Sequence, residues 1–182
     1  MIIETSRLII KSIDEMDLKN ILNCISNIYL SIPIPKNASS YHIKKFLEFN
    51  NKIKSFNSLG YFSIHLKQTS KIIGLLSIIP RYIEENLINE IGYLISKEFR
   101  NNGFASEAVF NMLTYIFSKT NITKIYSLIE KNNLPSKHII ENKMKFDFFD
   151  VILDTTNFKN IYTLDKDVFV DRIKKLKKVN YI

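Results

Sequence analysis

The 182-residue sequence predicts an α/β (α+β) fold of one domain, with a mixed, mostly antiparallel central sheet of about six to seven strands and about four flanking helices. Four observations support this class. Some segments carry apolar residues at helical spacing, and others are short β-branched runs bounded by turn residues. The hydrophobic content of 46% is enough for one ordinary core, and no repeat or linker-like tract divides residues 1–182.

The first third of the chain predicts one strand followed by two helices. Residues 7–13 alternate weakly and predict the strand, and Asp14 can cap a helix that runs to about residue 27. The proline-rich segment 31–35 must be non-helical, and Ser39 or Ser40 can cap the second helix after it. The apolar faces of the two helices are Leu18, Ile21, Leu22 and Ile25, and then Ile43, Phe46, Leu47 and Ile53.

The remainder of the chain predicts six strands and further helices. The strands are expected at residues 61–66, 71–80, 87–95, 124–129, 146–153 and 160–164. A helix is expected at residues 106–119, and another follows Pro135, which suits a first helical turn, and reaches about Met144. Residues 166–182 form a basic tail that we expect to be helical.

A glycine stands at the corner between the strand 87–95 and the helix 106–119. Gly103 belongs to the segment Arg100-Asn101-Asn102-Gly103-Phe104-Ala105. Glycine lets backbone amide groups converge on one point, and the helix N-terminus adds roughly half a positive charge there. The corner therefore predicts a site that holds a pyrophosphate.

This corner and its flanks resemble the acetyl-CoA signature of the GNAT superfamily of N-acetyltransferases. The resemblance is carried by Glu90-Ile91-Gly92-Tyr93-Leu94-Ile95 and by the run from Phe99 to Ala108. Other segments resemble the Rim-type branch, which acetylates the N-termini of ribosomal proteins. They are Thr5-Ser6-Arg7-Leu8-Ile9-Ile10-Lys11, Ile32-Pro33-Ile34-Pro35, Lys71-Ile72-Ile73-Gly74-Leu75 and Asn133-Leu134-Pro135-Ser136.

The resemblance implies acetyl-CoA as cosubstrate, no metal, and direct transfer of the acetyl group to a primary amine, foremost a protein N-terminal α-amine. A bend at Gly92 would leave main-chain groups of Leu94 and Ile95 ready for the pantetheine arm. The expected cofactor-binding residues are Leu94, Ile95, Arg100, Asn102, Gly103, Phe104, Ala105, Ser106 and Asn133. Arg100 could instead be a surface arginine, and Asn133 a helix cap.

Two residues are candidates for catalysis. Glu90 precedes Gly92 by two positions and could accept a proton through water, or it could be a strand carboxylate or an ion-pair partner. Ser136 could donate to the departing sulfur, or it could bond a backbone amide early in its helix. Glu84 and Glu85 could form an acidic rim for a cationic substrate, or a solvated loop.

The helix after Pro135 departs from the family pattern. Met144-Lys145-Phe146 lacks the glycine that usually ends this helix, and Phe146 falls one residue late. Ile140 stands where many relatives have a tyrosine that acts as general acid. The departures concern the helix register and the general acid, and they leave the cofactor corner untouched.

Composition limits the kinds of site and the location that the protein can have. The single Cys24 excludes an intramolecular disulfide and fits the cytoplasm, and no apolar stretch is long enough to span a membrane. His42, His65 and His138 have no metal-ligand spacing, so structural or solvated roles are expected for them. The net charge is +8, and the last twelve residues hold five basic residues and one acidic residue. A solvated terminal helix is the favoured interpretation, and contact with RNA is the other.

Two further functions stay open at this stage. One is acetylation of a small amine such as a polyamine or an aminated antibiotic, although few acidic residues occur in the expected acceptor region. The other is a non-catalytic module that binds acyl-CoA. The sequence names neither the acceptor nor the oligomeric state.

Overall fold

In the computed structural model, the described residues are 1–24, 32–35, 37–55, 59–154 and 157–179. They form eight β-strands and five α-helices, together with a 3₁₀ helix and a π-helix. The chain divides into two compact units, residues 1–112 and 113–182. All strand pairs described within each unit are antiparallel, in agreement with the predicted α+β class.

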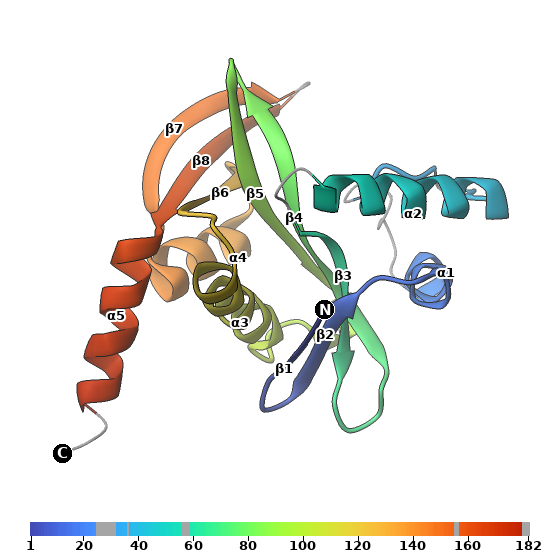
Figure 1. Cartoon of the computed structure of the whole chain (residues 1–182), viewed down its shortest axis with the longest axis horizontal. Helices are drawn as coiled ribbons and strands as arrows, with labels where there is room; N and C mark the ends of the chain where they lie inside the picture. Colours follow the sequence, from blue (N-terminus) through green and yellow to red (C-terminus); the bar gives the residue numbers. More distant parts are fainter. Residues whose placement is uncertain (25–31, 36, 56–58, 155–156, 180–182) are drawn as a thin grey trace. The chain divides into compact units, whose positions relative to one another are not determined.

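The first unit is an antiparallel sheet with helices on its faces. Its five strands lie in chain order, each paired with the next. Figure 1 shows α1 and α2 on one side of this sheet and the beginning of α3 on the other. The elements are β1 (Ile2–Glu4), β2 (Leu8–Ser12), α1 (Glu15–Cys24), α2 (Ser40–Ser55), β3 (Gly60–Leu66), β4 (Ile72–Ile83), β5 (Asn86–Ile95), η2 (Lys97–Phe99) and the first part of α3 (Phe104–Lys119).

Asp14 caps its helix with its side chain as predicted, whereas Ser39 lies at the predicted position before α2 but its hydroxyl contacts the His42 ring. Asp14 Oδ1 accepts a hydrogen bond from the Asp17 N–H at 2.8 Å, which caps α1. At the start of α2, the Ser39 carbonyl accepts from the Ile43 N–H at 3.1 Å, and Ser39 Oγ lies 2.9 Å from His42 Nδ1. The first predicted helix was expected to reach residue 27, and its last three residues lie outside the described ones.

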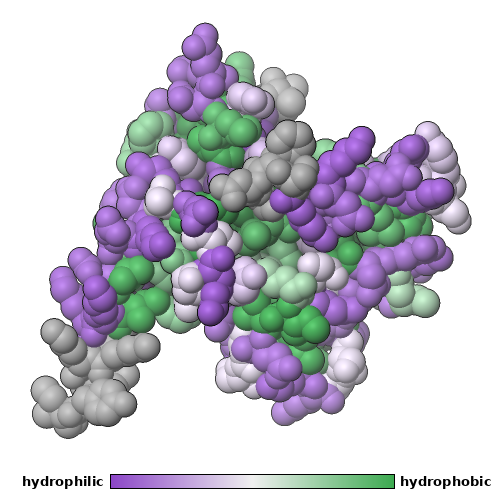
Figure 2. Space-filling model, viewed as in Figure 1, coloured by the Kyte–Doolittle hydropathy of each residue, from purple (hydrophilic) through white to green (hydrophobic). Residues whose placement is uncertain are grey.

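The core of the first unit lies between its sheet and the helices α1 and α2. Leu18 and Ile21 of α1 and Phe46 of α2 belong to one buried cluster with Tyr61 and Leu75 of the sheet. Figure 2 shows hydrophilic side chains over these two helices and hydrophobic side chains between them. Each fully buried side chain of this kind contributes about 1.5–3 kcal/mol, so packing of the apolar stripes holds the helices in place.

The second unit combines three strands with helices. β8 pairs with both β6 and β7, and Phe117 of α3 stacks against Phe169 of α5 with ring centroids 5.3 Å apart. The basic C-terminal segment is helical over residues 166–179. The elements are the rest of α3, β6 (Lys124–Glu130), α4 (Leu134–Lys137), η3 (His138–Met144), β7 (Asp147–Asp154), β8 (Asn157–Asp165) and α5 (Lys166–Val179).

One strand of the first unit is not predicted by the sequence. β1 is only three residues long and pairs with β2 in the register Ile3 to Ile10. A two-residue alternation cannot stand out over three positions, so the hydrophobic pattern carries no signal there.

The departure after Pro135 has a structural explanation. The helix ends at Met144 as expected, but residues 138–144 form a π-helix, η3, which takes up an extra residue within the helix. Lys145 adopts a left-handed φ of 61°, the conformation that glycine usually supplies, and the Phe146 N–H donates to the Ile140 carbonyl at 3.0 Å. The π turn therefore accommodates the one extra residue before Phe146, and Lys145 adopts the conformation of the missing glycine.

Candidate cofactor and acceptor site

The corner between β5 and α3 has the backbone geometry that an anion site needs. Gly103 has a φ of +77°, which glycine adopts without strain, and its carbonyl accepts the first helical bond from the Glu107 N–H at 3.0 Å. Among the described residues, none accepts a hydrogen bond from the amide groups of residues 103–106. Four donors at the N-terminus of a 16-residue helix are therefore available to an anion.

Two predicted cofactor ligands brace the loop before Gly103. Arg100 Nε donates to the Ile95 carbonyl at 3.0 Å, which ties the loop back to the end of β5. Asn102 Nδ2 donates to the Arg100 carbonyl at 2.8 Å. Arg100, Asn102 and Gly103 are all exposed, so the loop is ordered by its own side chains while its surface stays accessible.

The other predicted residues of the corner form the first turn of α3. Phe104, Ala105 and Ser106 are partly buried there. The Arg7 guanidinium lies over the Phe104 ring, 4.6 Å from its centroid. The sequence places Arg7 in a motif but does not predict this contact, because no local spacing connects residues so far apart in the chain.

Leu94 and Ile95 end β5 beside β4. Leu94 pairs with Leu75, and Ile95 pairs with Gly74. A Cβ atom on Gly74 would lie 2.3 Å from the Leu94 carbonyl oxygen, so any larger residue would displace the end of β5. Gly74 thus fixes the main chain that we expect to hold the pantetheine arm.

Glu90 lies on β5 opposite Ile79, and only 11% of its side chain is exposed. Its Oε2 forms a hydrogen-bonded ion pair with Arg81 Nε. Burial and then the Glu90 charge raise the pKa of Tyr61 to about 12, against a smaller opposing effect of Arg81. The structure thus contains the ion pair that was one interpretation of Glu90, and its role as a base stays a prediction.

Asn133 and Ser136 lie together in the second unit, at the start of α4. Asn133 is the N-cap residue, and its Oδ1 accepts a hydrogen bond from the Ser136 N–H at 3.2 Å. Asn133 therefore caps the helix, and Ser136 lies in its first turn. The role of Asn133 as a cofactor ligand and that of Ser136 as a donor to the departing sulfur stay predictions. Ile140, at the tyrosine position of relatives, is completely buried and supplies no proton.

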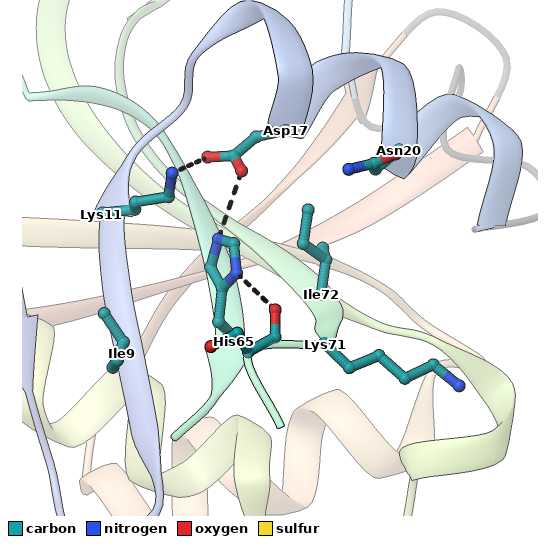
Figure 3. A pocket seen from close by; sticks show the side chains of 8 residues that line it. Ile9, Lys11, Asp17, Asn20, His65, Lys71 and Ile72 are labelled. Carbon is teal, nitrogen blue, oxygen red and sulfur yellow. Dashed lines mark hydrogen bonds and ion pairs between the residues drawn. The ribbon is translucent and has the colours of Figure 1, made fainter. Parts of the chain in front are cut away.

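A cleft of about 520 Å³ in the first unit contains none of the predicted site residues. Figure 3 shows Asp17 reaching both Lys11 and His65: Lys11 Nζ lies 3.0 Å from Oδ2, and His65 Nε2 lies 3.5 Å from Oδ1. His65 Nδ1 lies 3.1 Å from the Ser70 carbonyl. These contacts anchor α1 to the sheet, which agrees with the structural role expected for His65. The lining residues are Ile9, Lys11, Asp17, Asn20, His65, Ser70, Lys71 and Ile72.

Among the described residues, no three or more His, Cys, Asp or Glu side chains are grouped so that they could hold a metal ion. No helix within the described ranges is long and apolar enough to cross a membrane.

Sequence relatives of this chain include bacterial proteins that are named as N-acetyltransferases. It is 31% identical to the uncharacterized N-acetyltransferase p20 of Bacillus licheniformis over 55% of each chain. It is 28% identical to the uncharacterized N-acetyltransferase YnaD of Bacillus subtilis over 78% of this chain and 80% of YnaD. The matches to p20 and to the uncharacterized Bacillus subtilis protein YkkB span 55% and 57% of the length of those relatives.

Solved structures with the same fold have different acceptors in their names. A GNAT-family acetyltransferase from Bacillus anthracis superposes with a TM-score of 0.71 at 20% identity, covering 92% of this chain and 99% of its own. RimL, a ribosomal α-N-protein acetyltransferase in complex with coenzyme A, superposes with a TM-score of 0.74 at 16% identity, covering 92% of this chain and 99% of RimL. A chimera of the spermidine N-acetyltransferase SpeG from Vibrio cholerae superposes with a TM-score of 0.71 at 21% identity, covering 91% of this chain and 99% of the chimera.

The family assignment rests on the sequence, because structural likeness at these identities concerns the fold alone. The acetyltransferase (GNAT) domain family matches residues 7–143, which is more than half of the chain. The matched range contains the corner at Gly103 and the end of β5. The chain therefore belongs to the GNAT acetyltransferase family.

Proposed function

We propose that this protein is an N-acetyltransferase that moves the acetyl group of acetyl-CoA directly to a primary amine, and that the acceptor is a protein N-terminal α-amine. The observation that carries the proposal is the corner at Gly103, with four amide donors that have no acceptor among the described residues. A pyrophosphate offers the charge and the acceptor oxygens that such a corner favours. A cytoplasmic location is part of the proposal, since the single cysteine cannot form an intramolecular disulfide.

The proposed cofactor contacts follow the chemistry of each group. Arg100, Asn102 and the amides of residues 103–106 hold the pyrophosphate, and the main chain of Leu94 and Ile95 holds the pantetheine arm. Asn133 is a further cofactor ligand in this proposal. Holding thioester and amine together can supply on the order of 7–11 kcal/mol of the barrier at best, so positioning is the main contribution.

The acceptor class follows from the state of the amine. A protein α-amine with a pKa of about 7.7–8 is already neutral in roughly a tenth of the molecules at pH 7. An alkyl amine with a pKa of about 10.4 is almost fully charged at that pH. An α-amine therefore needs only a weak base, and Glu90 acting through water is the proposed one. Ser136 donates to the departing sulfur, although a thiol with a pKa near about 8.5 can leave without full protonation.

The ion pair at Glu90 supports an α-amine over a polyamine. Arg81 already neutralises the carboxylate of Glu90, so this carboxylate offers little attraction for a polycation. SpeG has the same fold and is named for spermidine, so spermidine belongs in the acceptor panel.

Calorimetric titration with acetyl-CoA is the test of the proposal, with coenzyme A and ATP as controls. We expect micromolar binding of acetyl-CoA and weak binding of ATP. A thiol-release assay then compares N-terminal peptides of ribosomal proteins with spermidine and an aminated antibiotic. Turnover of spermidine alone would replace the α-amine by a polyamine, and binding without any turnover would indicate an acyl-CoA-binding module. Absence of acetyl-CoA binding by the folded protein would refute the proposal.

A further inference from the structure

The carboxylate of Glu107 collects hydrogen bonds from the N-terminal segment of the chain. Thr5 Oγ1 donates to Oε1 at 2.5 Å, and Ser6 Oγ and the Arg7 N–H donate to the same oxygen at 3.0 Å. Arg7 Nε donates to Oε2 at 2.6 Å. Glu107 lies on α3 four residues after Gly103, so the segment 5–7 is tied to the helix turn that follows the corner.

Arg7 also contacts the corner itself, on both sides of Gly103. Its Nη1 donates to the Asn102 carbonyl at 3.0 Å, and its guanidinium covers the Phe104 ring. A Cβ atom on Gly103 would have Arg7 Nη2 as its nearest neighbour, at 3.5 Å. One side chain thus holds the residue before the glycine, the residue after it and, through Glu107, the next turn of α3.

The contact with Asn102 orients a donor. All described peptide bonds are trans, and in a trans peptide the carbonyl and the following N–H point in opposite directions. Because Arg7 holds the Asn102 carbonyl, the Gly103 N–H points away from the guanidinium and remains available to an anion. Without Arg7, the Asn102 carbonyl would lose this donor, and the peptide unit would lose one restraint on its rotation.

The contact with Glu107 removes an electrostatic obstacle. A glutamate in the turn after the corner places a negative charge near the position that a pyrophosphate would occupy, and 12% of its side chain is exposed. The Arg7 guanidinium neutralises that charge at 2.6 Å. An uncompensated carboxylate would repel the phosphates through a medium that screens charges less well than bulk water.

We propose that Arg7 is a positioning residue for the cofactor: it fixes the Asn102–Gly103 peptide and neutralises Glu107, so that the corner accepts the pyrophosphate of acetyl-CoA. The inference rests on the proposed function and adds to it a residue outside the corner segment.

Calorimetric affinities of variants for coenzyme A test this role. Arg7→Ala should bind coenzyme A about ten-fold more weakly, the loss expected when charge-assisted hydrogen bonds are removed. Arg7→Lys should lie between wild type and Arg7→Ala, because one ammonium cannot replace the two-pronged guanidinium. Lys67→Ala is the matched control, since it removes the ion pair of Lys67 with Glu4 at 2.9 Å and should leave the affinity unchanged.

A second probe separates positioning from general stability. S-acetylpantetheine lacks the pyrophosphate, so a protein-detected NMR titration should give the same affinity for wild type and Arg7→Ala. Adding Glu107→Gln to Arg7→Ala should restore part of the coenzyme A affinity, because it removes the uncompensated charge. If Arg7→Ala does not fold, Arg7→Lys with and without Glu107→Gln provides the same comparisons.

The outcomes distinguish the two proposals. Equal coenzyme A affinity of wild type, Arg7→Ala and Lys67→Ala would overturn the role of Arg7 and leave the proposed function standing. An equal loss of affinity for coenzyme A and S-acetylpantetheine would also overturn it, in favour of a general structural role. If wild type binds no coenzyme A, the proposed function fails, and the role of Arg7 fails with it.

Discussion

The constraint at Gly103 concerns conformation more than space. A Cβ atom added there would meet no atom closer than 3.5 Å, but the φ of +77° is unfavourable for residues with a side chain. The left-handed conformation costs an L-residue about 1–2 kcal/mol, and asparagine tolerates it better than other residues do. A substitution should therefore change the corner by turning its backbone, while the core below it stays packed.

Gly103→Val should weaken acetyl-CoA binding by about ten-fold or more, because a β-branched residue is a strong outlier at positive φ. Gly103→Asn is the matched variant and should retain most of the affinity. Calorimetry with both folded proteins is the measurement. Equal affinity of wild type and Gly103→Val would remove the corner from the cofactor site.

Glu90→Gln should lower turnover more than it lowers acetyl-CoA affinity, if Glu90 accepts the proton of the amine. General-base contributions are typically about 10²–10⁴-fold, and the low end is expected for an α-amine that is partly neutral already. The measurement is kcat from pH 6 to 9, with Glu15→Gln on the exposed face of α1 as control. Equal turnover of Glu90→Gln and wild type across this range would assign Glu90 to the ion pair with Arg81 alone.

At the scale of elements, η3 ends in a strained lysine. Lys145 has a φ of 61°, where glycine would carry no penalty. Lys145→Gly should stabilise the protein by about 1 kcal/mol, which corresponds to a rise in Tm of about 2–4 °C for a chain of this size. Lys143→Gly, inside η3, should lower Tm instead. Thermal unfolding followed by circular dichroism measures both Tm values. A Tm of Lys145→Gly below that of wild type would contradict the strain at Lys145.

One buried carboxylate adds polar contacts to the apolar packing of α1 against the sheet. Asp17 accepts from Ser63 Oγ at 2.7 Å and pairs with Lys11 at 3.0 Å, and its side chain is 5% exposed. Asp17→Ala should destabilise the protein by about 3 kcal/mol, because it leaves buried polar partners without an acceptor. Glu15→Ala, on the exposed face of the same helix, should cost less than about 0.5 kcal/mol. Urea unfolding measures both, and similar values for the two variants would contradict the anchoring role.

Local signals predicted most elements but not the contacts among them. Capping by Asp14, the start of α2 after Ser39 and the corner at Gly103 depend on neighbouring residues, so the sequence could indicate them. The contact of Arg7 with Glu107 joins residues a hundred positions apart, and no spacing rule reaches that far. The π turn of η3 is similar, because the late position of Phe146 indicates a departure from the family pattern but does not indicate the form that the helix takes.

At the scale of the whole molecule, Asp14 and Glu107 are among the carboxylates that make stability depend on pH. Partial burial raises the pKa values of Asp14 and Glu107, but hydrogen bonds to each outweigh it, so both lie below their ordinary values of 3.8 and 4.5. A lowered pKa in the folded state adds stability above the unfolded pKa, and this stability is lost as pH falls through the folded pKa. We therefore expect full stability at neutral pH and a loss that begins below about pH 4.5.

The free energy of unfolding in urea from pH 3 to 7 measures this dependence. The double variant Asp14→Asn, Glu107→Gln should show a flatter profile than wild type below about pH 4.5. Identical slopes for the two proteins would mean that other carboxylates cause the loss.

The hydrogen bonds to Glu107 also affect the order of folding. They join residues about a hundred positions apart, whereas the backbone hydrogen bonds within α3 join residues four positions apart. Closing so long a loop carries an entropic cost that contacts nearer in sequence do not, and non-local contacts form late in folding. During refolding, helical circular dichroism should therefore recover before coenzyme A binding does. In a chain that is still folding, α3 would form before Arg7 and Glu107 complete the corner at Gly103.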